Sequence, residues 1–178
     1  SVLDLGCGDG LLLERLQREG AARVQGLELE PEAVLRCIER HVPVIQHDLD
    51  DGLPGFEDST WDVVICEETL QALRRPVAVL QEILRVGRRG IVTFPNFAHW
   101  RMRMDLFLHG RMPVTPSYPH HWYDSPNIHP ITLADFQDWA QEAHIHIALA
   151  YAYAAGSIRP LNGDDNLHAE QVLLVIER

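Results

Sequence analysis

Apolar residues fall along this chain in two kinds of segment: short continuous runs, and longer stretches with helical spacing. Short runs are typical of strands buried on both faces, and the longer stretches are typical of helices with one apolar side. The predicted strands are Val2–Leu5, Val24–Leu29, Val44–Asp48, Val63–Cys66 and Ile91–Phe94. The predicted helices are Leu11–Glu19, Pro31–Arg40 and Pro76–Val86. This alternation predicts a parallel sheet with helices on both faces.

The last third of the chain departs from this alternation. Thr132-Leu133-Ala134-Asp135 resembles a capping box, which predicts a helix to about Ala143. Two apolar segments, Ile145–Ala154 and Gln171–Ile176, follow and predict a closing antiparallel hairpin across the turn-rich stretch Gly156–Asn166. With no linker or repeat, residues 1–178 form one predicted domain. Because the first strand starts at once, we expect a short native N-terminal segment to precede it.

Irregular segments follow several predicted strands, at the edge where open α/β sheets bind ligands. The acidic stretch Asp48–Asp58 is expected to be exposed, and Phe94–Trp100 follows the fifth strand. The longest irregular segment is Gly110–Ile131, and long loops of this kind are usually lids or binding loops. We expect it to cover the strand ends, with Trp122 and Tyr123 shielding a pocket or meeting a partner. Burial of these two rings in their own core is the alternative.

The charge of the chain limits its partners. The net charge is −11, which argues against nucleic acid, and no apolar run is long enough to span a membrane. The three scattered cysteines are typical of reduced thiols in a cytoplasmic protein. All fifteen basic residues are arginine, and eight of them lie between Arg74 and Arg111. This region is either a solvated helix face or a docking patch for an acidic partner or ligand.

Three glycines at alternate positions, Gly6-Cys7-Gly8-Asp9-Gly10, stand where the first strand passes to the first helix. Glycine lets the backbone approach a ligand closely, and the helix N-terminus offers free N–H groups. The spacing is shorter than the G-x-G-x-x-G dinucleotide motif. With Asp4 two residues before Gly6, it resembles the first motif of class I S-adenosylmethionine-dependent methyltransferases. A bare structural turn is the alternative.

Two acidic residues at strand ends extend this resemblance. Glu28 ends the second predicted strand twenty residues after Gly8, the separation expected for a ribose-binding acid. A solvated strand-end glutamate is the alternative, because Glu30 and Glu32 lie beside it. Asp48 ends the third strand, where the methyltransferase fold implies an acceptor for the adenine amino group. Leu49 would contact the same ring.

Other chemistries find less support in the sequence. His120, His121, Asp124 and His129 are metal-ligand types, but adjacent histidines converge poorly and no second cluster completes a site, so we predict no metal. The chain lacks a G-x-S-x-G nucleophile elbow, which argues against acyl transfer by its own serine. Methyl transfer often needs little more than positioning. The candidate catalytic bases are Glu67, His99, Tyr123 and His129.

Several longer motifs make the resemblance more specific. Between Val2 and about Asp135 the chain is similar to the MetW family of bacterial methionine biosynthesis. The shared motifs are VLDLGCGDG, IQHDLDDGL, LQAL-RRP, VGRRGIVTFPNFAHWR, GRMPVT and WYDSPNIHPIT. The last three carry most of the resemblance, because generic methyltransferases lack them. His120-His121 is where other residues are expected before the tryptophan in relatives.

The resemblance implies a class I methyltransferase-like fold, with a doubly wound, mostly parallel seven-stranded sheet and an antiparallel last strand. It implies S-adenosylmethionine or S-adenosylhomocysteine as ligand, and as partner a homoserine O-acyltransferase of the α/β-hydrolase type whose activity the chain supports. The alternative is a methyltransferase acting on a small molecule. Arg101, Arg103, Trp122 and Tyr123 are the candidate partner contacts. The expected cofactor-binding residues are Asp4, Gly6, Cys7, Gly8, Gly10, Glu28, Leu29, Asp48, Leu49 and Cys66.

Overall fold

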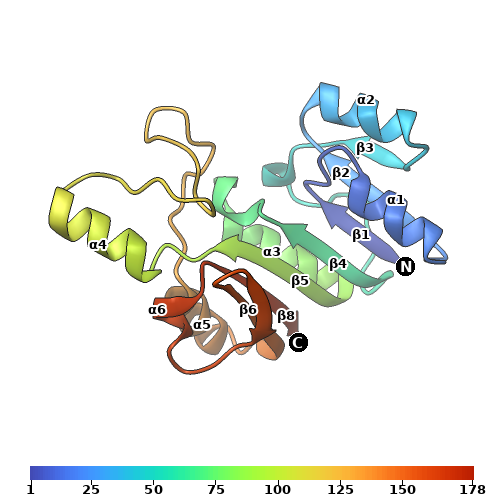
Figure 1. Cartoon of the computed structure of the whole chain (residues 1–178). Coiled ribbons are helices and arrows are strands. Elements are labelled where there is room, and N and C mark those ends of the chain that lie inside the picture. The colour runs from blue at the N-terminus through green and yellow to red at the C-terminus, as the bar shows by residue number, and fades with distance from the viewer.

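The apolar runs form one eight-stranded sheet in the computed structural model, which describes every residue from Ser1 to Arg178 (Figure 1). Its strands are β1 Val2–Leu5, β2 Val24–Glu28, β3 Val44–Gln46, β4 Trp61–Glu67, β5 Gly87–Pro95, β6 His146–Ala154, β7 Ser157–Pro160 and β8 Gln171–Glu177. The spatial order is β3-β2-β1-β4-β5-β8-β6-β7. Strands β1 to β5 pair in parallel, and β8 runs antiparallel to both β5 and β6. The predicted doubly wound sheet with an antiparallel last strand is confirmed.

One strand more than the predicted seven is present, because β7 forms inside the stretch expected to be only turns. Ala155 and Gly156 both have positive φ and make a two-residue turn that folds β7 back onto β6. Such turns match the twist of the paired strands. The strand is four residues long and ends in Pro160 at the edge of the sheet, where a missing N–H is tolerated. So short a segment leaves almost no alternation to detect.

Six helices accompany the sheet. They are α1 Leu11–Arg18, α2 Pro31–Glu39, α3 Pro76–Val86, α4 Trp100–His109, α5 Leu133–Glu142 and α6 Asp165–His168. Helices α1 and α2 share a small apolar cluster with β2, and α3 and α5 pack with β4, β5 and β8 in the main core of 25 buried residues.

None of the helices combines the length and apolarity needed to cross a membrane.

Helix α4 is absent from the predicted elements and projects away from the sheet (Figure 1). Apolar residues stand at most of its positions, so they do not mark one side of a helix. Met102 is its only buried residue. The helix ends at Gly110, whose φ of 61° is a left-handed conformation that glycine adopts easily.

Asn96, directly after β5, ties three parts of the fold together and was not singled out by the sequence. It is fully buried. Its Nδ2 donates to the carbonyl oxygens of Asp165, Asn166 and Ala169 at 3.0–3.3 Å. Its Oδ1 accepts from the N–H groups of Ala98 and Leu133 at 3.2 and 3.1 Å. One side chain thereby connects the end of β5, the start of α5 and the segment around α6.

We expect Asn96→Ala to lower the free energy of unfolding by about 3 kcal/mol or more, because it leaves several buried backbone groups unpaired. Urea denaturation followed by circular dichroism measures this change. The control is Asn127→Ala, since the Asn127 side chain is half-buried on a surface loop and makes no comparable set of bonds. Equal stability of the two variants would contradict the structural role of Asn96.

Candidate ligand-binding site

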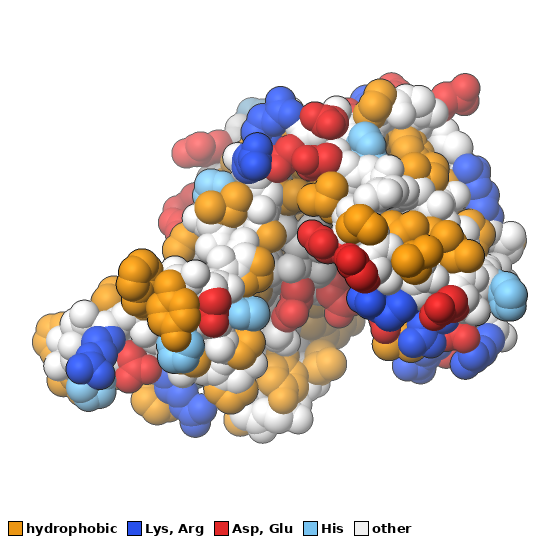
Figure 2. Space-filling model, turned by 90° about the horizontal axis from the view of Figure 1, so that it is seen from above, with side chains coloured by type: hydrophobic (Ala, Val, Ile, Leu, Met, Phe, Trp, Pro, Cys, Tyr) orange, Lys and Arg blue, Asp and Glu red, His pale blue; other side chains and the backbone are white.

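A pocket of about 370 Å³ opens at the carboxyl ends of β1 and β2. Its volume is in the range of small-molecule sites, and its position is the one at which open α/β sheets bind ligands. Figure 2 shows acidic side chains standing around a hollow in the middle of the molecule. The pocket lining combines strand ends, turns and part of the long loop: Gly6, Leu27, Glu28, Leu29, His47, Asp48, Leu49, Asp50, Glu68, Thr69, Ala72, Leu73, Arg74, Pro126 and Asn127.

The three glycines of the first turn all have positive φ, but only one of them has open space beside it. A Cβ on Gly6 would lie 2.3 Å from Oγ1 of Thr69, and one on Gly10 would lie 2.9 Å from Sγ of Cys37. These two positions are therefore closed by packing. A Cβ on Gly8 would meet nothing within 4 Å. The backbone at Gly8 is consequently the part of the turn that is open to approach.

Glu28 connects this turn to the end of β2. Its Oε2 accepts from the N–H of Gly8 at 2.8 Å, and its Oε1 accepts from the N–H groups of Leu29 and Glu30 at 2.8 and 2.9 Å. An ionised carboxylate has about four acceptor sites. Three are used here, so Glu28 is fixed in place and keeps capacity for one further donor. Glu28 is therefore not a freely solvated glutamate.

Asp48 and Leu49 form another part of the pocket wall. Oδ1 of Asp48 accepts from the N–H of Asp50 at 2.9 Å and caps the 3₁₀ turn Leu49–Asp51. Leu49 is buried. The carboxylate of Asp50 in turn accepts from the N–H groups of Arg75 and Arg74 at 2.9 and 3.1 Å. The wall is therefore joined to the segment that leads into α3.

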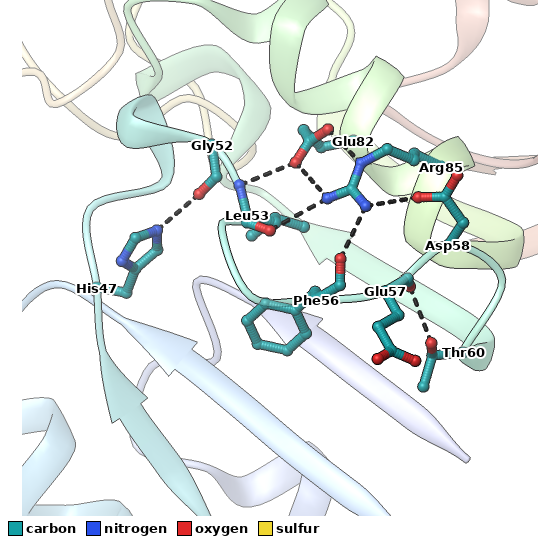
Figure 3. Close-up of polar contacts among 9 residues, drawn as sticks. All are labelled: His47, Gly52, Leu53, Phe56, Glu57, Asp58, Thr60, Glu82 and Arg85. Carbon is teal, nitrogen blue, oxygen red and sulfur yellow. Dashed lines mark hydrogen bonds and ion pairs between the residues drawn. The ribbon is translucent and has the colours of Figure 1, made fainter.

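In the acidic segment after this wall, Asp51, Glu57 and Asp58 are exposed as expected, and Arg85 of α3 anchors the segment (Figure 3). The guanidinium donates to the carbonyl oxygens of Phe56 and Leu53 at 2.7 and 3.1 Å, and to the carboxylates of Asp58 and Glu82 at 2.7–2.8 Å. The hydrogen bond from Arg85 lowers the pKa of Glu82. Figure 3 shows these groups gathered around one guanidinium. Leu53 is consequently buried, and the loop is held against α3.

Asp4 is a buried acidic residue beside the pocket. It is 3 % exposed, and its Oδ1 has no hydrogen-bond partner. Burial first, and then the negative charges of Glu67 and Glu28, raise the pKa of this carboxyl to about 7. A buried acceptor without a donor is costly. Asp4 is therefore poised to pair with a donor, above all a cationic one.

The backbone is strained at the residue that directly follows β4. Glu68 has a φ of 46°, which is uncommon for a residue other than glycine. Burial and the charge of Glu67 raise its pKa, and its carboxylate accepts from Nε2 of Gln171. Backbone strain of this kind concentrates at functional sites. A second cavity of about 160 Å³ lies here, lined by Glu67, Glu68, Thr93, Tyr151, Ala152, Tyr153, Ile158, Gln171, Val172 and Leu173.

The structure brings half of the ten expected cofactor residues to the pocket wall. These five are Gly6, Glu28, Leu29, Asp48 and Leu49. Gly8 reaches the wall through its bond to Glu28, whereas Asp4, Cys7 and Gly10 are buried and do not line the pocket. Cys66 lies in the main core rather than in the wall, and its complete burial raises the pKa of its thiol to about 12. Thr69, Arg74 and Asn127 also line the pocket, and no spacing rule in the sequence indicates them.

The four candidate bases do not converge. Glu67 lines the second cavity, and His99 is buried at the start of α4, where burial lowers its pKa. Tyr123 is exposed on the long loop. His129 is exposed, and its backbone N–H donates to the carbonyl of Gln71. No group of three or more His, Cys, Asp and Glu side chains is arranged to hold a metal ion.

The long loop from residue 110 to 131 covers the pocket only with its second half. Pro126 and Asn127 line the pocket, and the N–H of Ile128 donates to the carbonyl of Gln71 at 2.9 Å. Trp122 and Tyr123 do not line it. Their rings pack edge to face with centroids 5.7 Å apart and remain exposed. The two rings therefore neither shield the pocket nor lie buried in a core.

The sheet order and the glycine turn define an S-adenosylmethionine-dependent methyltransferase fold, and comparison with solved structures agrees. A methyltransferase from Archaeoglobus fulgidus superposes with a TM-score of 0.72 at 14% identity, covering 99% of this chain and 85% of that one. A possible histamine N-methyltransferase from Thermotoga maritima gives 0.71 at 14% identity, covering 98% and 80%. At such identities the likeness establishes the fold alone.

The chain belongs to the family of methionine biosynthesis protein MetW, whose family model matches residues 1–176. The resemblance found in the motifs is thereby confirmed. A bifunctional methionine biosynthesis protein MetXA/MetW from Rhodopirellula baltica is 36% identical over 189 aligned residues, covering all of this chain and 30% of that protein. A ubiquinone biosynthesis O-methyltransferase from Paraburkholderia xenovorans is 30% identical over 60% of this chain and 48% of that protein. The chain thus spans less than half the length of either relative.

Proposed function

We propose that this methionine biosynthesis protein is an adenosyl-ligand-binding accessory subunit that raises the activity of a homoserine O-acyltransferase. The observation that carries the proposal is the Rhodopirellula baltica relative, whose name joins a MetXA part and a MetW part in one chain. Two domains joined in one chain have a high effective concentration for each other, so they associate readily. In separate chains, the same association needs a binding surface.

Five residues at and beside the pocket support S-adenosylmethionine or S-adenosylhomocysteine as its ligand. The unpaired acceptor of Asp4 suits the ammonium group of the ligand, and the open backbone at Gly8 lets the ligand lie close to the turn. Glu28 keeps capacity for a ribose hydroxyl, and Asp48 lies at the wall where the adenine amino group would need an acceptor. Leu49 offers an apolar surface to the ring. When bound, adenosylmethionine supplies an activated methyl group on its sulfonium.

A regulatory role gives this pocket a use that does not require a catalytic base. The ligand is a product derived from methionine, so its binding reports the output of the pathway. Any effect of the ligand on partner affinity must be matched by an equal effect of the partner on ligand affinity. The candidate bases would then be structural. His99 is buried at the N-cap position of α4, and the carbonyl of Gln71 accepts from the backbone N–H of His129.

The four proposed partner contacts, Arg101, Arg103, Trp122 and Tyr123, are all exposed. Arg103 differs in its contacts, because its guanidinium donates to the carbonyl oxygens of Ala98 and Asn166 and so holds α4 to the body. Charge reversal at Arg101 therefore tests association, whereas reversal at Arg103 also tests folding. Exposed charges mainly change the rate of encounter.

A second candidate function is methyl transfer to a small molecule. The cavity of about 160 Å³ beside Glu67 favours it, because it lies at the strand edge next to the proposed cofactor pocket. Tyr151 and Ile158 give this cavity an apolar wall, and Glu67 offers a carboxylate that would accept a proton from an acceptor group. Such a reaction would need both cavities to be filled together.

The test is to assay homoserine O-acylation by the acyltransferase alone and with this chain, using acetyl-CoA and succinyl-CoA in separate reactions. We expect the chain to raise the rate severalfold with one donor. Adenosylmethionine and adenosylhomocysteine are then titrated to detect modulation. Equal rates with and without the chain would contradict the accessory function. Transfer of labelled methyl from adenosylmethionine to a small molecule would then favour the second candidate.

A further inference from the structure

An arm of this chain exposes apolar side chains that nothing in the fold covers. We define the arm as residues 100–114, comprising α4 and the segment after it, together with Trp122 and Tyr123. Phe107 is 83% exposed, Trp122 79%, Tyr123 68% and Leu108 60%. Met104, Met112 and Val114 are exposed as well. Figure 2 shows hydrophobic side chains gathered on this projecting part of the molecule.

The arm is attached to the body near its start, and of its residues only Met102 and Pro113 are buried. Met102 is buried, and Arg103 bonds to the carbonyl oxygens of Ala98 and Asn166. Beyond this attachment, an open hollow separates α4 from the chain that follows it, bordered by Asp105, His109, Arg111, Met112, Pro113, Val114 and His121. Large exposed apolar side chains concentrated on one part of a molecule mark an interaction site.

The charge of the arm differs from that of the rest of the chain. Arg101, Arg103 and Arg111 outnumber the single acidic residue Asp105, while the chain as a whole carries −11. An isologous contact brings the same patch of two copies together, and here it would set arginines against arginines. The arm therefore fits a different molecule better than a second copy, and the facing surface should be acidic at its rim.

We propose that the arm is the docking surface for the homoserine O-acyltransferase, which rests on the function proposed above. The apolar side chains at Phe107 and Leu108 insert into an apolar depression on the acyltransferase, and carboxylates at its rim face Arg101 and Arg111. The buried apolar contacts supply most of the affinity, and the arginines speed the encounter. The MetXA/MetW relative supports this occupant, because it keeps the two parts together in one chain.

The experiment measures the dissociation constant between purified acyltransferase and this chain by calorimetry. The test variant is Phe107→Ser/Leu108→Ser. The matched control is Leu35→Ser/Ile38→Ser. It removes one leucine and one isoleucine side chain from the surface of α2, which are 59% and 57% exposed. We expect the test variant to weaken binding at least about thirtyfold, as loss of a central contact does, and the control to change it less than about threefold. Adenosylhomocysteine should bind both variants like the wild type.

Three results would overturn the inference. If the test variant binds the acyltransferase as tightly as the control does, the arm is not the docking surface, although the accessory function would stand. If the wild-type chain forms dimers that the test variant loses while acyltransferase binding persists, the arm joins two copies instead. If the wild-type chain does not bind the acyltransferase at all, both this inference and the proposed function fail.

Discussion

Asp4→Asn is expected to stabilise the protein at pH 8 and, at the same time, to weaken its binding of adenosylhomocysteine. The carboxyl is buried with an unpaired Oδ1, and its pKa is raised from 3.8 to about 7. An asparagine keeps the shape and removes the buried charge. Because its amide also lacks partners, we expect a net gain of about 1–3 kcal/mol rather than the about 4 kcal/mol that the pKa change alone would give.

The dependence on pH follows from the direction of this change. Below about pH 4 the carboxyl is protonated in both the folded and the unfolded state, so it contributes nothing. Between about pH 4 and pH 7 the folded state keeps a proton that the unfolded state releases, and the stability of the wild type therefore falls as the pH rises. Above about pH 7 the penalty is complete. The advantage of Asp4→Asn should grow across this window, as urea denaturation at several pH values would measure.

Ligand binding should change in the opposite direction. The ionised carboxylate is the proposed partner of the ligand's ammonium group, so we expect Asp4→Asn to weaken binding at least tenfold in calorimetry at pH 8. Asp9→Asn is the control, because Asp9 lies on the same turn and its carboxylate is 3.5 Å from Arg40 instead. A variant that is less stable than the wild type at pH 8, or that binds with unchanged affinity, would contradict the assignment of Asp4.

Gly8→Leu is expected to abolish adenosylhomocysteine binding while the fold persists. A side chain here extends into open space beside Glu28, where the ligand would approach the turn. Its φ of 56° is a left-handed conformation, so the substitution should also cost about 1–2 kcal/mol of stability. Calorimetry measures the binding, and thermal denaturation with circular dichroism measures the stability.

Gly20→Leu separates these two effects. Gly20 also has a positive φ, 97°, and no atom within 4 Å of a Cβ, but it lies in the turn between α1 and β2. The two variants should lose similar stability, and only the one at Gly8 should lose binding. Ligand binding by Gly8→Leu at wild-type affinity would show that the ligand does not approach this turn.

Local patterns were sufficient to predict the site's framework. Whether a segment becomes a buried strand depends on its own apolar run, and the glycine turn depends on residues that are neighbours in sequence. The position of Glu28 at the end of β2 follows, because the carboxyl ends of parallel strands meet at one edge. Asp48 was expected to end the third strand, but β3 ends at Gln46 and Asp48 caps the 3₁₀ turn that follows. The motifs FPNFAHW, GRMPVT and WYDSPNIH indicated the family by resemblance, without explaining what their residues do.

The tertiary structure alone decided which of these residues are free to act. Asn96 belongs to a family motif, but its five hydrogen bonds join segments up to 73 residues apart. Arg103 was expected on a partner surface and is bound to the body, whereas Phe107 and Leu108 drew no attention in the sequence and prove to be exposed. Burial and hydrogen-bond partners are properties of contacts between distant segments. A sequence pattern therefore identifies the elements, and only their packing shows which side chains remain unpaired.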